Sequence, residues 1–333
     1  MNAHWVPTGM NIELTTCCPL NCPQCYCSLL GGRHIALETA QKALVEGRRL
    51  GIEHVELSGG ETLCYPHLHD VIVTARQLGI APNISISGWH FDDVCLSTLI
   101  EDGIEGIHVS LNGPTEESNA LSRDGFEMAI SALDLLKRRK FSRTRINWVM
   151  HRDTSNLLEK MITLAQTYQV KTIVIMMPKP TASNELLTFP LREQIEHVAN
   201  LVKHNSSSVE LSVETCFSQI LALIGQNRFW GNLNCGEELG CTAGRSSLNV
   251  SVDGRYSPCR HLDCYEDFDT MEEYWIRSVI LQEIRNLESN RQEPCKNCSF
   301  CNYCRHCLAY NFKVKGKLLI GNENCTVYQT ISD

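Results

Sequence analysis

The feature that most constrains this chain is a short run of cysteines near its N-terminus. Cys18, Cys22 and Cys25 have the spacing C-x3-C-x2-C, and Pro19 and Pro23 force the backbone between them to loop. Three thiolates from one loop can hold three irons of a 4Fe–4S cluster, which normally takes four cysteines. The fourth iron would then keep an open coordination position, which is typical of a reacting metal site and not of a structural one. A zinc loop or buried free thiols are the alternatives.

The chain has eighteen cysteines, and its N-terminus carries no charged-then-apolar secretory signal. In a reducing compartment, clustered cysteines indicate metal ligands or redox groups, because disulfides are not expected there. Five cysteines fall within residues 17–27, and a larger group lies between Cys235 and Cys325. The distribution predicts one metal centre at each end of the chain, with the C-terminal one larger.

Net charge and hydropathy limit the classes of partner that this chain is expected to bind. A formal net charge of −8 argues against a nucleic-acid polyanion as the main partner. The sequence contains no uninterrupted apolar run long enough to span a membrane. We therefore expect a cytoplasmic protein with neither nucleic acid nor membrane among its partners.

Strand-like and helix-like patterns alternate after the cysteine loop. Strands are expected at 10–15, 53–57, 83–87, 106–111, 143–150 and 171–177, and helices at 36–50, 67–78, 92–101, 125–138, 156–168 and 191–204. Six βα units of this length imply parallel strands with right-handed crossovers. The periodicity alone leaves an open sheet and a curved barrel equally possible. In a parallel α/β barrel the chemistry sits at the C-terminal ends of the strands, where the cysteine loop and other polar turns fall.

The cysteine loop after a first strand, with Gly59-Gly60-Glu61 after the second, resembles the radical S-adenosylmethionine (SAM) enzymes. The resemblance implies a partial (βα)6 barrel in which Cys18, Cys22 and Cys25 hold a cluster whose open iron chelates SAM. It also implies a set of cofactor contacts: Gly59, Gly60 and Glu61 at the SAM amino group, Ser110 at the ribose or carboxylate, Asn147 at the nucleoside and Tyr26 near the adenine. Without the cluster, the glycines and Ser110 would simply be polar turns. His90, His151 and Cys64 also follow strands, but nothing selects one as an acid or base.

The C-terminal part contains alternating residues around Asp253-Gly254, which predicts a β-hairpin with Cys241 and Cys259 at adjacent strand ends. Cys295-x2-Cys298-x5-Cys304-x2-Cys307 and then Cys325 follow. This arrangement resembles the SPASM domain, an extension of radical SAM enzymes that carries two auxiliary 4Fe–4S clusters. A zinc ribbon is the alternative, because paired C-x2-C elements also suit zinc.

The SPASM resemblance implies two ligand sets: Cys235, Cys241, Cys259 and Cys307 for an inner cluster, and Cys295, Cys298, Cys304 and Cys325 for an outer one. The family usually has three residues where this chain has Arg305-His306, so one ligand is open to reassignment, and Cys301 is unassigned. The domains expected are a radical SAM core at 1–205, a bridging segment at 206–234 and a SPASM domain at 235–333.

The resemblance implies reductive cleavage of SAM to a 5′-deoxyadenosyl radical, which abstracts a hydrogen atom from a ribosomally made precursor peptide. An oxidation, a cross-link or a backbone rearrangement would follow. The alternatives are a small-molecule (amino-sugar) dehydrogenase and an enzyme of the anaerobic sulfatase-maturing type. A non-catalytic iron–sulfur or zinc scaffold is a third.

The expected partners are the precursor peptide and an electron donor of the flavodoxin or ferredoxin type. A separate leader-peptide recognition protein is also expected, because only about ten residues precede the first strand.

Overall fold

The computed structural model describes residues 5–25, 32–179, 189–224, 240–301, 304–318, 320–321, 325 and 327. Within these residues one sheet has the strand order β7-β6-β5-β4-β3-β2-β1-β8-β9. The strands are β1 (Gly9–Thr15), β2 (His54–Gly59), β3 (Ala81–Ile86), β4 (Gly106–Ser110), β5 (Thr144–Val149), β6 (Thr172–Met176), β7 (Glu210–Val213), β8 (Ser247–Val250) and β9 (Tyr256–Ser257).

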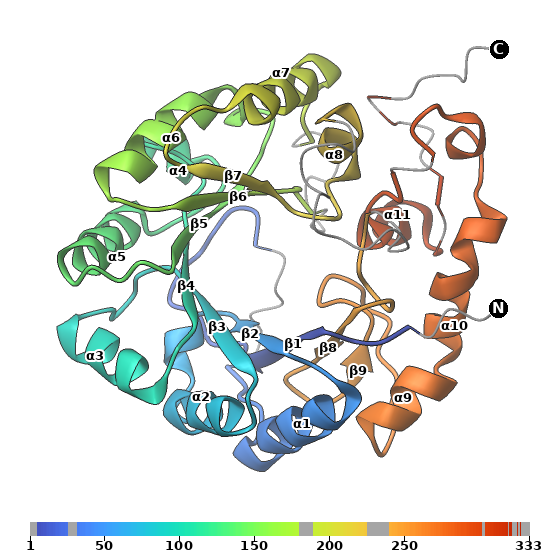
Figure 1. The fold of residues 1–333 in the computed structure, drawn as a ribbon, viewed down its shortest axis with the longest axis horizontal. Coiled ribbons are helices and arrows are strands. Elements are labelled where there is room, and N and C mark those ends of the chain that lie inside the picture. The colour runs from blue at the N-terminus through green and yellow to red at the C-terminus, as the bar shows by residue number, and fades with distance from the viewer. Residues whose placement is uncertain are drawn as a thin grey trace.

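The helices follow the strands along the chain. They are α1 (Leu37–Leu50), α2 (Leu68–Gln77), α3 (Asp93–Asp102), α4 (Glu116–Ala120), α5 (Phe126–Arg138), α6 (Leu158–Thr167), α7 (Arg192–His204), α8 (Ser218–Ile224), α9 (Met271–Arg277), α10 (Val279–Asn286) and α11 (Leu308–Lys315). Strands β1 to β7 are parallel and curve around a common centre, with α1 to α7 outside them (Figure 1). The α/β architecture is therefore confirmed.

Two elements of the barrel differ from the prediction. β7 was expected to lie in a bridging segment, but it pairs in parallel with β6, with Thr172 opposite Glu210, and so extends the barrel to a seventh strand. The short helix α4 was not predicted. It begins with a capping box in which Thr115 and Ser118 satisfy each other's backbone N–H groups, a local device that does not depend on apolar periodicity.

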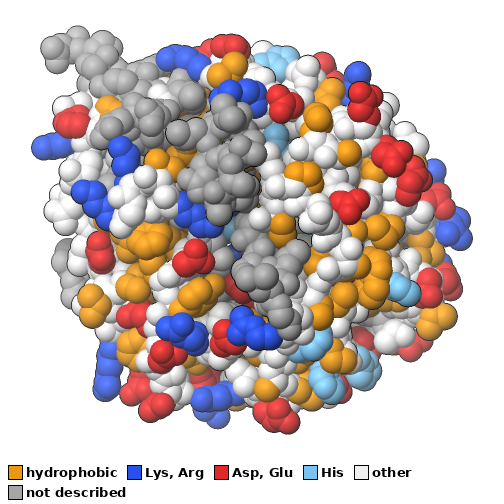
Figure 2. Space-filling model, turned by 180° about the vertical axis from the view of Figure 1, so that it is seen from behind, with side chains coloured by type: hydrophobic (Ala, Val, Ile, Leu, Met, Phe, Trp, Pro, Cys, Tyr) orange, Lys and Arg blue, Asp and Glu red, His pale blue; other side chains and the backbone are white. Residues whose placement is uncertain are grey.

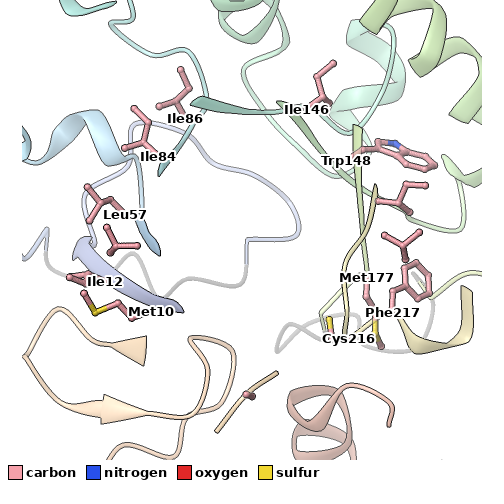
Figure 3. Packing of buried hydrophobic residues seen from close by; sticks show 14 of the residues in the cluster. Met10, Ile12, Leu57, Ile84, Ile86, Ile146, Trp148, Met177, Cys216 and Phe217 are labelled. Atoms are coloured by element: carbon pink, nitrogen blue, oxygen red, sulfur yellow. The ribbon is translucent and has the colours of Figure 1, made fainter. Parts of the chain in front are cut away.

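Alternation along the strands separates an apolar outer layer from a polar interior. In β1, Met10, Ile12 and Leu14 are buried, and Figure 3 shows Met10 and Ile12 in the same apolar layer as Leu57 of β2. The residues between them face the inside of the arc, where Asn11 lines a cavity. Because successive side chains of a strand point to opposite faces, the same strand serves the core and the interior.

The C-terminal part closes the side of the arc that the barrel strands leave (Figure 1). β8 pairs in parallel with β1, and β9 pairs antiparallel with β8 around the Asp253-Gly254 turn, so the predicted hairpin is present. The hydrogen bond from Trp275 Nε1 to Trp5 O, 2.8 Å long, also joins α9 to the N-terminal segment. The domain boundaries at 205 and 234 stay predictions.

The surface opposite to the view of Figure 1 carries mixed charge. Figure 2 shows Lys and Arg side chains interspersed with Asp and Glu side chains over this face. Among the helices of the described residues, none is both long and apolar enough to cross a membrane.

Candidate functional site

Loops at the C-terminal ends of the barrel strands line one pocket, which we call the barrel pocket. It contains eight of the residues predicted from the sequence: Cys18, Cys22, Cys25, Gly59, Gly60, Glu61, Ser110 and Asn147. They come from the loop after β1, from the β2 and β4 ends, and from β5 itself. Tyr26, the predicted neighbour of adenine, lies outside the described residues. The parallel strands therefore bring together residues that are up to 129 positions apart, from Cys18 to Asn147.

Gly59 and Gly60 are required by the close approach of two backbone segments. A Cβ on Gly59 would lie 2.2 Å from Thr15 O, and one on Gly60 would lie 2.2 Å from Cys17 O. Gly60 N donates to Thr15 O at 2.7 Å, and Glu61 N donates to Cys17 O at 2.8 Å. The turn after β2 is thus fastened to the base of the cysteine loop, so the glycines position the thiols whatever else they contact.

The Glu61 carboxylate is buried and hydrogen-bonded. It accepts from Ser87 N at 2.8 Å, from Ser87 Oγ and from Leu63 N at 3.3 Å. Burial raises the pKa of Glu61, although the hydrogen bonds from Ser87 act in the opposite direction. These contacts tie the β2 and β3 ends together. The binding of the SAM amino group by this residue stays a prediction.

Two asparagines hold the neighbouring strand ends. Asn147 Nδ2 donates to Ser85 Oγ at 3.3 Å, and both asparagines line the barrel pocket, although only 5% of the Asn112 surface is exposed. Asn112 Oδ1 accepts from Val149 N at 3.1 Å, and Asn112 O accepts from Trp148 Nε1 at 3.1 Å. The side-chain amide of Asn112 therefore joins the end of β4 to β5.

His151 also lines the barrel pocket, although no sequence pattern distinguished it from the other candidate side chains. Only 5% of its surface is exposed, and its Nδ1 has no hydrogen-bond partner among the described residues. Burial lowers the pKa of His151 to about 4, so the imidazole is neutral at pH 7. It offers the pocket a neutral polar atom. His90 and Cys64, weighed with it, are absent from the lining of this pocket.

A second cavity, the inner cysteine pocket, encloses about 400 Å³ between the barrel and the hairpin. Cys241, Cys259 and Cys307, three members of the predicted inner set, line it, and Cys216 joins them. The fourth predicted member, Cys235, lies outside the described residues. The inner pocket shares three lining residues with the barrel pocket, namely Lys179, Arg260 and His261.

A buried ion pair lies beside these thiols. Lys179 Nζ is 2.9 Å from Glu214 Oε2 and 3.0 Å from Cys216 Sγ. The hydrogen bond from Cys216, helped by the Lys179 charge, lowers the pKa of Cys307 to about 6 against the opposing effect of burial. The same hydrogen bond and burial raise the pKa of Cys216 well above its usual value. Within this hydrogen-bonded pair, Cys216 therefore holds its proton more tightly than Cys307 does.

The outer cysteine pocket contains the whole predicted outer set. Its lining includes Cys295, Cys298, Cys304 and Cys325, together with the unassigned Cys301. Burial raises the pKa of Cys304 to about 12. Ligation would therefore require the positive charge of a metal to draw the proton from this thiol.

The donor sets fit iron–sulfur clusters. All three pockets are lined by thiols, the ligands that such clusters take. Among the described residues, no three His, Cys, Asp or Glu side chains converge on a point where one ion could sit. The thiols instead line spaces of different size, about 400 Å³ in the inner pocket and about 20 Å³ in the outer pocket. The ligand roles of the individual cysteines stay predictions.

Comparison with known proteins agrees with this geometry. The model of the radical SAM superfamily matches residues 12–165. A PqqA peptide cyclase of Gluconobacter oxydans is 26% identical over 309 residues, which cover 88% of this chain and 82% of that protein. A PqqA peptide cyclase of Ruegeria pomeroyi is also 26% identical, over 315 residues, with 88% and 79% covered.

Two solved structures share the fold. Streptococcus suis SuiB bound to S-adenosylmethionine matches with a TM-score of 0.73 at 15% identity, covering 98% of this chain and 77% of SuiB. The enzyme anSMEcpe with bound AdoMet and a peptide matches with a TM-score of 0.72 at 16% identity, covering 97% and 93%.

Residues 12–165, which carry the first cysteine loop, thus match the radical SAM superfamily, as the C-x3-C-x2-C spacing predicted. Proteins of this superfamily bind SAM and a 4Fe–4S cluster, and the barrel pocket provides thiols and polar groups for both. The Cys-rich C-terminal part is consistent with auxiliary clusters of the SPASM type.

Proposed function

We propose that this protein is a radical SAM enzyme that modifies a ribosomally made precursor peptide. The observation that carries the proposal is the common wall of two pockets. Lys179, Arg260 and His261 line both the barrel pocket and the inner cysteine pocket, so a substrate held at this wall lies beside both cysteine sites. An enzyme that only cleaved SAM would have no need of the second site.

The relatives support a peptide as the substrate. The two curated relatives are named as cyclases of the peptide PqqA, and a further structure of SuiB is described as bound to the precursor peptide SuiA. The match to the Gluconobacter protein covers 88% of this chain and the match to SuiB covers 98%, so both extend beyond the barrel into the cysteine-rich C-terminal part. The kind of bond made in this protein's own substrate does not follow from these names.

In this proposal Cys18, Cys22 and Cys25 hold the first cluster, and the turn from Gly59 to Glu61, with Ser110 and Asn147, receives SAM. When bound, these groups supply a 5′-deoxyadenosyl radical, which removes a hydrogen atom from the substrate. The chain's own contribution is to confine that reaction. Aliphatic side chains from β5 and β6, among them Val149 and Met176, line the same pocket and exclude water from it.

Two partners belong to the proposal. A precursor peptide with a leader segment would be presented by a separate recognition protein, because ordering an extended peptide costs entropy that a leader contact can offset. A flavodoxin or ferredoxin would supply the electron. We also propose a cytoplasmic location, because thiols that bind clusters must stay reduced and the cytoplasm is a reducing compartment.

The test uses the peptide encoded beside this gene, deuterated at one residue at a time, with anaerobically reconstituted enzyme, SAM and dithionite. We expect deuterium to enter 5′-deoxyadenosine from a single position and the peptide to lose mass as it is oxidised. The variant Cys18→Ala/Cys22→Ala/Cys25→Ala should release no 5′-deoxyadenosine. If no peptide delivered deuterium, with or without a leader-binding protein, and an amino-sugar did, the substrate class would be wrong.

A further inference from the structure

Cys216 lies outside every cysteine motif of the sequence, yet the fold places it among the thiols of the inner pocket. It sits in the turn between β7 and α8, where Figure 3 shows it next to Phe217. The turn is fixed by backbone hydrogen bonds from Glu214 N to Ile175 O, 2.9 Å long, and from Phe217 N to Glu214 O, 2.8 Å long. Phe217 is fully buried, so the position of Cys216 is set by the core.

Cys216 is buried, with 7% of its surface exposed, yet its environment is polar. A buried free cysteine usually behaves as a small apolar side chain. Here the sulfur accepts a hydrogen bond from Lys179 Nζ at 3.0 Å and is hydrogen-bonded to Cys307. Four thiols of the described residues therefore line one cavity: Cys216, Cys241, Cys259 and Cys307.

The lysine beside Cys216 is held in one orientation. Its ammonium has three donors, and they reach Glu214 Oε2 at 2.9 Å, Met177 O at 3.2 Å and Cys216 Sγ at 3.0 Å. Glu214 is fixed in turn, because its Oε2 accepts from Met177 N at 3.0 Å. A cluster with four thiolates carries net negative charge, and a hydrogen-bonding cation at one sulfur offsets part of it.

We propose that Cys216 is a ligand of the inner auxiliary cluster, together with Cys241, Cys259 and Cys307, and that Lys179 donates a hydrogen bond to its sulfur. The inference rests on the proposed function only in requiring an iron–sulfur cluster in the inner pocket. It reassigns the fourth ligand position, for which the SPASM resemblance implied Cys235. Cys216 is 91 residues before Cys307, and no spacing rule connects them.

The experiment measures the clusters without any substrate. In the background Cys18→Ala/Cys22→Ala/Cys25→Ala, only the auxiliary clusters remain, or roughly eight irons per chain at four per cluster. Adding Cys216→Ala should remove the inner cluster or convert it to a three-iron form, so iron falls toward roughly four per chain and the EPR spectrum changes. Adding Cys235→Ala or Cys95→Ala should leave iron and spectrum unchanged. Cys95 is the matched control, since it lies on α3 and lines none of the three pockets.

The conservative variant Cys216→Ser keeps the test valid if the alanine variant misfolds. A serine ligand should retain the iron but change the EPR g-values and the midpoint potential of one cluster, whereas a side chain that is not a ligand leaves both as they were. Full iron and an unchanged spectrum in Cys216→Ala, with loss in Cys235→Ala, would overturn the inference. The proposed function would survive that result, provided that the enzyme with its first cluster intact still cleaved SAM. The proposed function would instead be contradicted if the unmodified protein bound no auxiliary cluster.

Discussion

The barrel and the segment that carries the outer cysteines use different means to hold their backbones in place. In the barrel, every strand from β1 to β7 pairs with a neighbour and buries aliphatic side chains under its helices. Residues 291–301 and 304–307 contain a single 3-10 turn, Cys295–Asn297, and none of the sheet's strands or α-helices. Their largest buried side chain is Arg305, which donates to Cys241 O at 3.2 Å and to Ile284 O.

This difference indicates where metal binding contributes to folding. Apolar burial stabilises the barrel at about 25 cal/mol per Å² of buried area, with or without a cofactor. A segment whose buried side chains are thiols, the Arg305 guanidinium and the His306 imidazole lacks that source of stability. The predicted outer cluster would supply stability there through the bonds between its irons and the thiolates.

The largest expected effect is that of removing the outer cluster. Cys295→Ala/Cys298→Ala should expose residues 291–307, so that their amide hydrogens exchange at least about a hundredfold faster, while β2 to β5 keep their protection. Hydrogen exchange read by mass spectrometry, under anaerobic conditions, measures both regions in one sample. Equal acceleration in the two regions would show that the barrel depends on the cluster as well.

The second expectation is that the predicted cluster site of the barrel depends on the close approach of the turn after β2 to the cysteine loop. Gly60→Ala should almost abolish SAM cleavage, because its Cβ would lie 2.2 Å from Cys17 O and displace the cysteine loop. Gly9→Ala is the matched control, since its Cβ would come no closer than 3.9 Å to His54 O. Release of 5′-deoxyadenosine, compared with far-UV circular dichroism, separates loss of the site from loss of the fold. Normal cleavage by Gly60→Ala would remove the structural role given to this glycine.

The smallest effect concerns pH and the barrel alone. His151 has a pKa of about 4 in the folded protein and about 6.5 when unfolded, so the unfolded chain binds its proton first as pH falls. This contribution to stability is complete above pH 6.5 and is lost between 6.5 and 4. The free energy of unfolding should therefore fall by about 2 kcal/mol from pH 7 to pH 5 through this group.

Urea unfolding at the two pH values measures this loss, and His151→Asn should reduce it by the same amount. If the two proteins showed the same pH dependence, His151 would titrate normally and the burial argument would be wrong.

Local patterns predicted most of the barrel. The expected helix at 125–138 corresponds to α5 (Phe126–Arg138), and the expected strand at 171–177 to β6 (Thr172–Met176), because apolar periodicity records one buried face. The gathering of Cys18, Gly60 and Ser110 in one pocket also followed, since parallel strands place their C-terminal ends together.

Contacts between residues that are far apart in the sequence and belong to no motif could not be predicted in this way. Lys179 and Cys216 belong to no motif and meet only because β6 and β7 are neighbours in the sheet. The pairing of β1 with β8 joins residues 238 positions apart, such as Asn11 and Asn249. The orphan Nδ1 of His151 depends on what packs around it, which no single-sequence pattern records.

The parallel pairing of β1 with β8 has a consequence for how the chain can be divided. Met10 lies opposite Leu248 and Ile12 opposite Val250, so both flanks of β1 are hydrogen-bonded, one by β2 and one by β8. A fragment cut before Ser247 would leave β1 as an unprotected edge strand with apolar neighbours, a surface prone to pairing with other chains and aggregating. The hairpin thus acts as a built-in cover for the first strand, and expression of the barrel alone would require a polar or charged substitute for that cover.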